Sequence, residues 1–250
     1  MKFQLRRYEE VTSTNDIALE AARHGAGDGL VVWAERQTRG RGQKNRAWES
    51  QPGSSLTFSV LFKPNEEELG VLGRFTALGG LAVAEAVREK TGHEAKIKWP
   101  NDVLLHGRKI CGVLAETDLQ PGKENAVVVG VGVNLLPGAF GTSAMMNYPA
   151  GDILSETGIA LEGEAFLLVV LDAMRKLRKS LPGGAFMEAW NSRLAFRGEL
   201  RDIRNHKGET GSFRLVGVHS DGTLMVEDAA GQIIRFQSAE VLPSSSSSAE

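Results

Sequence analysis

The chain has 250 residues, with 29 basic and 31 acidic side chains and a formal net charge of −2. This length allows one large domain or one domain with a small appendage, and the balanced charge gives no reason to expect DNA or a membrane as a partner. Cys111 is the single cysteine, which excludes an intramolecular disulfide and is typical of a reducing compartment. Because the sequence has no signal-peptide pattern and no run near the ~20 apolar residues of a membrane span, we expect a cytoplasmic protein.

The first predicted element is a short helix over residues 17–24, which Gly25 ends. Ser13, Thr14 and Asn15 stand before it, and all three are residue types that cap helix N-termini. For this stretch alone, capping is the simplest role of these side chains. The pattern therefore predicts a helix start and leaves a second role for the three residues open.

A long basic loop connects two predicted strands, residues 30–34 and 56–62. Its charged and flexible positions are Arg39, Gly40, Arg41, Gly42, Lys44 and Arg46. Long loops without secondary structure of their own are uncommon and often functional. Glycine lets the backbone approach a ligand, and the arginine fork binds phosphate or carboxylate. The loop is either an anion-binding loop over a small-molecule site or a solvated basic loop.

Helix and turn signals continue after the second strand. Residues 66–90 are predicted to form one helix that Gly92 ends. A strand then ends near Trp99, because the proline that follows restricts the backbone before it. Residues 101–102 form a turn, and residues 106–108 form a tight turn between the two strands of a hairpin.

The next predicted strand, residues 126–133, carries Gly130 and Gly132 near its end and leads to Asn134. Glycine weakens a strand and often marks a place where a ligand approaches the backbone. The end of this strand is therefore a candidate wall of a binding site.

The last third of the chain changes from helical patterns to short strands. Helices are predicted over residues 152–157, 162–180 and 186–196, and short strands over residues 199–203, 211–218, 223–227 and 232–237. The strands indicate a small barrel of about five strands. We place the domain boundary after Arg197, which gives a catalytic domain at 1–197 and an appendage at 198–243. The serine-rich tail, residues 244–250, is expected to be disordered.

Several common types of site are excluded by their missing motifs. The phosphate loop G-x-x-x-x-G-K-[ST] and the nucleophile elbow G-x-S-x-G are absent, and Gly130-Val131-Gly132 lacks the third glycine of a dinucleotide fingerprint. Five scattered histidines and one cysteine match no metal-ligand spacing. Cys111 stands in an apolar strand, where burial makes a thiol inert, so we interpret it as a core residue.

Four polar clusters remain in or beside the apolar elements. They are Ser13 to Asn15, Gln37 with the basic loop, Lys98 to Asp102 with Lys109, and Gly130, Gly132 and Asn134. Their lysines and arginines have no matching cluster of carboxylates in the sequence. Cations of this kind bind anions, so we expect an anionic ligand such as a phosphate together with a carboxylate.

The order of these clusters is specific. The motifs are Ser13-Thr14-Asn15, Gln37-x-x-Gly40-Arg41-Gly42-x-x-x-Arg46-x-Trp48-x-Ser50, Lys98-Trp99-Pro100-Asn101-Asp102, Arg108-Lys109-Ile110-x-Gly112 and Gly130-x-Gly132-x-Asn134. Together they resemble the biotin protein ligases, the biotin–[acetyl-CoA-carboxylase] ligases, over most of residues 10–135. The resemblance implies an α+β fold of the class II synthetase-like type, with a mixed, mostly antiparallel sheet, helices on one side and a C-terminal SH3-like barrel.

The resemblance also implies a reaction in two steps. Biotin's carboxylate attacks the α-phosphorus of ATP, giving biotinyl-5′-AMP and pyrophosphate, and a lysine of a biotin carboxyl carrier domain then takes the biotin and releases AMP. The first step brings two anions together, so it needs cations and Mg²⁺ to offset their repulsion. The implied ligands are thus ATP, biotin and Mg²⁺; no residue is assigned to the metal.

By the same resemblance, Arg41 and Lys109 are the expected catalytic residues. The expected biotin-binding residues are Ser13, Thr14, Asn15, Gln37, Gly40, Arg41, Gly42, Gln43, Lys109, Gly112, Gly130 and Gly132. The expected ATP-binding residues are Arg41, Asn101, Asp102, Lys109 and Asn134. The amides of Gly40 and Gly42 are expected to bind the same anion. Lys98 and Trp99 could equally support the turn, and the adenine pocket within residues 139–150 stays unassigned.

Two departures from the family pattern matter. Gln43 stands where the family usually has a second arginine of Gly-Arg-Gly-Arg, and we expect this enzyme to hold the adenylate less tightly. The Ser-Thr-Asn motif begins at Ser13, so we expect neither an N-terminal helix-turn-helix nor DNA binding. A homodimer is possible. The alternatives are a lipoate or octanoate protein ligase, which shares the architecture, and a non-catalytic biotin-binding module.

Overall fold

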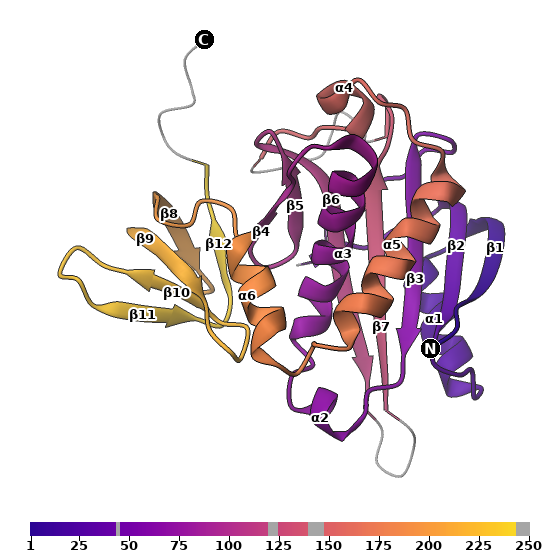
Figure 1. Cartoon of the computed structure of the whole chain (residues 1–250), viewed down its shortest axis with the longest axis horizontal. Helices are drawn as coiled ribbons and strands as arrows, with labels where there is room; N and C mark the ends of the chain where they lie inside the picture. The colour runs from indigo at the N-terminus through magenta and orange to yellow at the C-terminus, as the bar shows by residue number, and fades with distance from the viewer. Residues whose placement is uncertain (44–45, 120–124, 140–147, 244–250) are drawn as a thin grey trace.

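The computed structural model describes residues 1–43, 46–119, 125–139 and 148–243 and folds them into two sheets with helices around them (Figure 1). The larger sheet has the spatial order β1-β2-β3-β7-β6-β5-β4. In chain order these strands are β1 (Gln4–Val11), β2 (Leu30–Gln37), β3 (Ser55–Phe62), β4 (Lys96–Lys98), β5 (Asp102–Leu105), β6 (Arg108–Asp118) and β7 (Ala126–Asn134). β1 and β2 are parallel and the other neighbours antiparallel, which confirms the predicted mixed, mostly antiparallel sheet.

The central strands are buried on both faces because their side chains alternate between two cores. On β3, Phe58 and Val60 belong to the large core, whereas Leu61 belongs to a smaller one on the opposite face. Every residue of β3 is buried. This double burial explains why the strand is apolar at most positions and why its polar members need partners in the protein.

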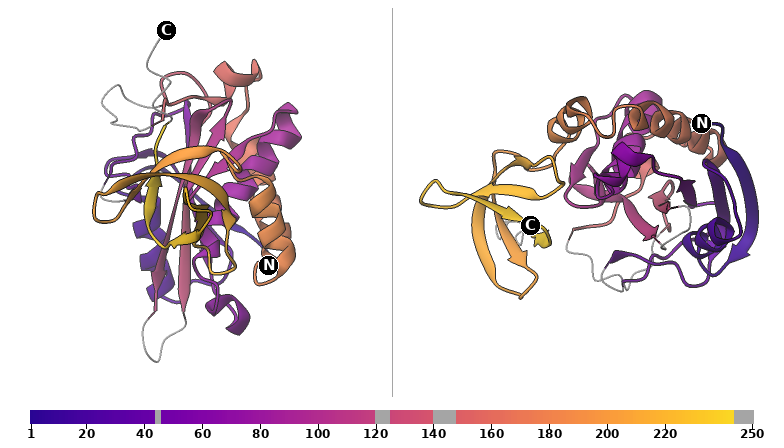
Figure 2. Two further views of the ribbon diagram at one scale, coloured as in Figure 1. Left: turned by 90° about the vertical axis from the view of Figure 1, so that its left-hand side faces the viewer. Right: turned by 90° about the horizontal axis from the view of Figure 1, so that it is seen from below.

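Helices cover both faces of the sheet. α3 (Arg74–Thr91) and α5 (Gly163–Arg178) pack on each other and on the large core. α1 (Thr14–Arg23) contacts β2, β3 and β7 in the smaller core, and Figure 2 shows it on the opposite side of the sheet from α3 and α5. The expectation that all helices lie on one side is therefore wrong. The physical reason is that Ala18 and its apolar neighbours on α1 cover the face of β3 that carries Leu61, opposite to the face in the large core.

The single helix predicted for residues 66–90 is two helices. Asn65 and Glu68 form a capping box that starts α2 (Glu66–Leu69), and α3 begins after Gly73. Gly92, with φ of 75°, ends α3 as predicted. Inside α3, a Cβ at Gly79 would lie 2.8 Å from Val113 Cγ1, so glycine permits the close packing of this helix on β6.

The C-terminal region forms a second sheet with the order β11-β10-β9-β8-β12 and antiparallel pairs. Its strands are β8 (Leu200–Asn205), β9 (Thr210–Val218), β10 (Leu224–Glu227), β11 (Ile233–Phe236) and β12 (Ala239–Val241). This arrangement fits an SH3-like unit, and β12 is the strand of this sheet that the sequence pattern did not predict. α4 (Ile153–Thr157) and α6 (Gly184–Ser192) complete the described helices. None of the described helices is long and apolar enough to cross a membrane.

The second sheet is joined to the first through a shared core. Trp190 of α6, Ile203 of β8 and Leu215 of β9 belong to the same large hydrophobic cluster as the main sheet. The Trp99 indole N–H donates to Gly222 O at 3.0 Å. The boundary after residue 197 stays a prediction, and the predicted disordered tail at 244–250 lies outside the described residues.

Candidate active site

A cavity of about 700 Å³ opens on the face of the large sheet that carries α1. It is lined by Ser13, Thr14, Asn15, Gln37, Arg41, Gly42, Gln43, Arg46, Ala47, Trp48, Glu49, Lys98, Pro100, Asn101, Asp102, Lys109, Gly112, Val113, Leu114, Gly130, Val131, Gly132, Asn134, Arg204, Ala239 and Glu240. All four predicted polar clusters therefore meet in one cavity. Gly40 is the member of the predicted site that lies behind the wall, where it lines an adjoining groove with Gln37 and Trp48.

The floor of the cavity is a row of residues across four strands. Gly132 of β7 pairs with Gly112 of β6, Gly112 with Asp102 of β5, and Asp102 with Lys98 of β4. Directly opposed residues in antiparallel strands share a face, so this row points into the cavity. A Cβ at Gly132 would lie 2.2 Å from the Trp48 ring, so only glycine leaves room for the indole above the floor.

One end of the cavity is a neutral hydrogen-bonding cluster. Thr14 N–H and Thr14 Oγ1–H donate to Gln37 Oε1 at 2.9 and 3.2 Å. Ser59 Oγ lies 2.7 Å from Thr14 Oγ1 and 2.6 Å from Asn15 Oδ1. Ser13 occupies the N-cap position of α1, but its side chain makes no capping hydrogen bond. Thr14 and Asn15 are thus tied to neighbouring strands rather than to the helix end.

Arg41 already has carboxylate partners. Its guanidinium lies 2.7 Å from Asp16 Oδ1 and donates to Glu116 Oε2 at 2.8 Å. Glu116 also accepts a hydrogen bond from Asn15 Nδ2 at 2.6 Å, so one carboxylate holds a helix residue and a loop residue together. The expectation that the cations have no matching carboxylates is therefore wrong. The sequence hides the match because Glu116 lies 75 positions from Arg41.

The opposite end of the cavity is a buried charge cluster. Lys109 Nζ lies 2.6 Å from Asp102 Oδ1, and Lys98 Nζ lies 3.2 Å from Asp102 Oδ2. Burial acts to raise the pKa of the Asp102 carboxyl, but the charges and hydrogen bonds of Lys109 and Lys98 outweigh it and hold that pKa below its usual value. Asp102 is therefore an anion at neutral pH, and the three side chains together carry one net positive charge.

A β-bulge aims Lys109 into the cavity. Val103 pairs with Cys111 and Leu104 with Lys109, so Ile110 is an extra residue in β6. Ile110 and Cys111 are both buried in the large core, whereas Lys109 and Gly112 face the cavity. Without the extra residue, strict alternation would turn Lys109 toward the core. Burial raises the pKa of the Cys111 thiol, which agrees with its predicted role as an inert core residue.

The two asparagines expected near ATP hold the backbone around this charge cluster. Asn101 Nδ2 donates to Val113 O at 3.0 Å, and Asn134 Nδ2 donates to Gly151 O at 2.9 Å. The oxygen Asn134 Oδ1 is buried and has no hydrogen-bond partner among the described residues. An orphaned buried acceptor that lines a cavity is a candidate ligand contact.

The basic loop reaches over the cavity through a short antiparallel contact. Gly42 N–H donates to Arg46 O at 2.7 Å, and Trp48 N–H donates to Gly40 O at 3.0 Å. The Gly42 amide, expected to bind the ligand anion, is thus occupied by its own loop. Gln43 lines the cavity and is half-buried, whereas Lys44 lies outside the described residues.

Several residues in or beside the cavity had no individual role assigned from the sequence. Trp48 was named only inside a motif and Arg46 only in the basic loop and that motif, and no part in the site was expected of Ser59, Asp16, Glu116, Arg204 or Glu240. Ser59 had a usable signal, because it is a polar residue in a strand that is otherwise nearly all apolar. Among the described residues, no group of three or more His, Cys, Asp or Glu side chains could hold a metal ion.

Comparisons with known proteins identify the family of this chain. The profile of the Biotin/lipoate A/B protein ligase family matches residues 8–134. The chain is 32% identical to the biotin–[acetyl-CoA-carboxylase] ligase of Paracoccus denitrificans, over 92% of this chain and 96% of that one. It is 27% identical to the bifunctional ligase/repressor BirA of Bacillus subtilis, over 94% of this chain and 72% of the relative.

A solved structure shares the architecture of both sheets. The biotin protein ligase from Aquifex aeolicus, in complex with biotin and ATP, matches with a TM-score of 0.80 and 28% identity. The match covers 96% of this chain and 99% of that one, so it includes the C-terminal sheet. The chain belongs to the Biotin/lipoate A/B protein ligase family, and within it to the biotin protein ligases.

Proposed function

We propose that this protein is an ATP-dependent ligase that activates biotin as biotinyl-5′-AMP and transfers it to a lysine of a biotin carboxyl carrier domain. The observation that carries the proposal is the polarity of the cavity. A neutral donor and acceptor cluster lies at one end, glycines form the floor, and the Lys109–Asp102–Lys98 cluster lies at the other end. A ligand with a neutral polar head, an apolar body and an anionic tail fits this order.

The neutral end suits the ureido ring of biotin. The ring carries one carbonyl acceptor and two N–H donors on an apolar bicycle, and such a group needs a few placed partners in an apolar pocket. Thr14, Gln37, Asn15 and Ser59 form a connected set of donors and acceptors there. Because all four side chains already bond one another, their orientations are set before the ligand enters.

The charged end suits the first half-reaction. A carboxylate oxygen of biotin attacks the α-phosphorus, the bond from phosphorus to the bridging oxygen breaks, and pyrophosphate leaves with the electron pair. Lys109 lines the cavity, and we assign to it the stabilisation of the negative charge shared by the carboxylate and the α-phosphate. Asp102 fixes the Lys109 ammonium at 2.6 Å, so the cation is oriented before the reaction begins.

Mg²⁺ would enter as the counter-ion of the triphosphate. The donor set of this cavity fits such an ion only in part. Asn134 Oδ1 is an oxygen donor of the kind Mg²⁺ prefers and lacks a partner among the described residues. Asp102, by contrast, is occupied by two ammonium groups. The ion when bound would neutralise charge on the phosphates, and Asn134 is the residue we propose to contact it.

The second half-reaction needs an acceptor amine. The ε-amine of the carrier lysine attacks the biotinyl carbonyl carbon, the bond to the phosphate oxygen breaks, AMP leaves, and the amine loses a proton. The mixed anhydride reacts with water, so the cavity must also retain and shield it. We propose that the loop bearing Arg41 and Trp48 serves this purpose, with Arg41 changing partner from Asp16 and Glu116 to the anion.

The test is to incubate the purified chain with ATP, Mg²⁺ and either biotin or lipoate, and to identify the acyl-adenylate by mass spectrometry. We expect biotinyl-AMP, and we expect the label on a carrier lysine when a biotin carboxyl carrier domain is added. No biotinyl-AMP would refute the proposal, and lipoyl-AMP alone would establish a lipoate ligase. Binding of biotin without adenylate would establish a non-catalytic binding module.

A further inference from the structure

The C-terminal sheet reaches into the wall of the cavity. Arg204 of β8 and Ala239 and Glu240 of β12 are among the residues that line it. Glu240 stands opposite Arg204 in the β8–β12 ladder, so both side chains project from the same face of that sheet. The cavity wall is therefore built from both sheets, although every site residue expected from the sequence lies before residue 135.

Glu240 joins this sheet to the basic loop. Arg46 donates a hydrogen bond to Glu240 Oε1 at 2.9 Å, and Arg204 lies 3.8 Å from Glu240 Oε2. The Glu240 side chain is 12% exposed, whereas those of Arg46 and Arg204 are 52% and 47% exposed. A carboxylate withdrawn from water between two guanidinium groups interacts with them more strongly than a fully solvated ion pair does.

Backbone hydrogen bonds connect Arg46 to the rest of the basic loop. Arg46 O accepts the hydrogen bond of Gly42 N–H, and the next pair of the same contact joins Trp48 to Gly40. Arg41, which precedes Gly42, forms an isolated β-bridge with Ala47. A restraint at Arg46 therefore also restrains the backbone that carries Arg41 and Trp48.

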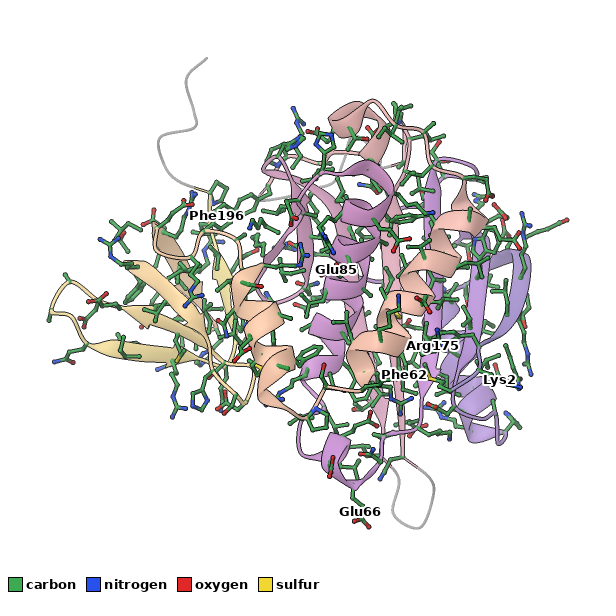
Figure 3. All side chains as sticks on the ribbon, viewed as in Figure 1. Lys2, Phe62, Glu66, Glu85, Arg175 and Phe196 are labelled. Carbon is green, nitrogen blue, oxygen red and sulfur yellow. The ribbon has the colours of Figure 1, made fainter. Side chains whose placement is uncertain are left out.

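The same strand end contacts a second segment at the cavity. Tyr148 Oη–H donates to Leu242 O at 2.9 Å, two residues after Glu240. The Tyr148 ring stacks on Phe196, which is labelled in Figure 3, with centroids 5.6 Å apart. Lys98 Nζ lies 4.8 Å from the centroid of the Tyr148 ring. β12 and Leu242 directly after it thus contact the basic loop on one side and, through Tyr148, the charge cluster on the other.

We propose that Glu240 is a positioning residue of the ligase reaction, which holds the basic loop over the cavity through Arg46 and thereby slows the escape of the acyl-adenylate. This proposal rests on the proposed function. It gives the C-terminal sheet a defined part in the site: β12 braces the loop whose residues cover the ligand. Glu240 itself contacts no reacting atom.

The first test uses a double-mutant cycle on adenylate retention. In Glu240→Gln and Arg46→Met the dissociation rate of biotinyl-AMP should rise about fivefold. This factor corresponds to the free energy that a partly exposed ion pair contributes. The rate of adenylate formation at saturating ATP and biotin should change less than about twofold, since no reacting group is altered. The double variant should be no worse than the more affected single variant, because each substitution removes the same contact between Arg46 and Glu240. Glu227→Gln, on β10 of the same sheet, is the matched control.

The second test needs no substrate. Hydrogen exchange of the Gly42 and Trp48 amides should be faster in Glu240→Gln than in the wild type and the Glu227→Gln control, with an unchanged melting temperature. The proposal is contradicted if the two substitutions have additive effects on the dissociation rate, or if both amides exchange in Glu240→Gln at the wild-type rate. If the wild type makes no biotinyl-AMP, the proposed function fails, whereas the exchange measurement still decides whether Glu240 restrains the loop.

Discussion

Lys109 Nζ lies 2.6 Å from Asp102 Oδ1, across a hairpin whose register is shifted by one residue. The shift is what turns Lys109 toward the cavity rather than the core, and Asp102 is what keeps its ammonium in place. Lys98 pairs with the second oxygen of the same carboxylate. The site therefore contains one fixed anion and two fixed cations before any substrate arrives.

Replacing Lys109 by alanine should separate chemistry from binding. We expect Lys109→Ala to lower the rate of adenylate formation by about 100-fold or more, because a preorganised charge at the reacting phosphate is lost. Biotin affinity, measured by titration calorimetry, should change little, since the neutral cluster is untouched. Lys98→Ala is the matched control, because it removes the other partner of Asp102. An equal loss of the adenylation rate in both variants would show that the loss arises from a disturbed Asp102 and not from the missing Lys109 ammonium.

Glu116 should govern biotin binding because it holds both Asn15 and Arg41. We expect Glu116→Ala to raise KM for biotin about tenfold, as two charge-assisted hydrogen bonds are lost, and to affect kcat less. Asp16 contacts Arg41 alone in this cluster, so Asp16→Ala should raise KM less. Steady-state kinetics on the two variants decides this. A larger effect from Asp16→Ala would contradict the role of Glu116.

Gly132 should be intolerant of even a methyl group. A Cβ there would lie 2.2 Å from the Trp48 ring, so Gly132→Ala must displace the indole from the cavity floor. We expect biotin affinity to fall by about tenfold or more, with secondary structure unchanged by circular dichroism. Gly184→Ala on α6 is the control, since no atom lies within 4 Å of a Cβ there. Wild-type affinity in Gly132→Ala would show that the ligand does not use this floor.

Gln43 lines the cavity at the position where the family usually has arginine. We expect Gln43→Arg to slow dissociation of biotinyl-AMP, because a guanidinium near the phosphate adds a charge-assisted hydrogen bond. The measurement is the half-life of the isolated enzyme–adenylate complex, and Gln43→Met serves as the uncharged control. An unchanged half-life in Gln43→Arg would refute the predicted weak retention.

The protein should lose stability in acid through one identified carboxylate, that of Glu68. Arg178 donates to the Glu68 carboxylate through Nε at 2.7 Å and through Nη2 at 2.9 Å. Burial acts to raise the pKa of Glu68, but the hydrogen bonds of Arg178 and Asn65 outweigh it, so the pKa in the folded state is lowered. The stability from this group is therefore complete above the unfolded-state pKa of about 4.3 and is lost as the pH falls through the folded-state pKa.

Glu68→Gln should accordingly lower the free energy of unfolding at pH 7 by roughly 2 kcal/mol and flatten its dependence on pH below about 4.3. Urea unfolding followed by circular dichroism at several pH values measures both effects. The neighbouring exposed residue gives the control Glu67→Gln, which should keep the wild-type slope. A steep acid transition that persists in Glu68→Gln would assign the acid sensitivity to another carboxyl, with Asp102 the next candidate.

The sequence by itself determined the local features. Apolar runs, caps and glycines predicted most elements, because these signals act within a few residues of where they stand. The spacing of glycines 130 and 132 with Asn134 marked one cavity wall, since a strand repeats every two residues. The ordered motifs pointed to the ligase family before any contact was known.

Only the tertiary structure decided which charges meet. Arg41 reaches Glu116 over 75 positions and Arg46 reaches Glu240 over 194, and no local pattern encodes pairs that distant. The bulge at Ile110 and the placement of α1 on the second face depend on how strands align, which is set by side-chain packing across the sheet. The sequence could not predict that the C-terminal sheet lines the cavity, because this depends on where β12 packs against the rest of the protein.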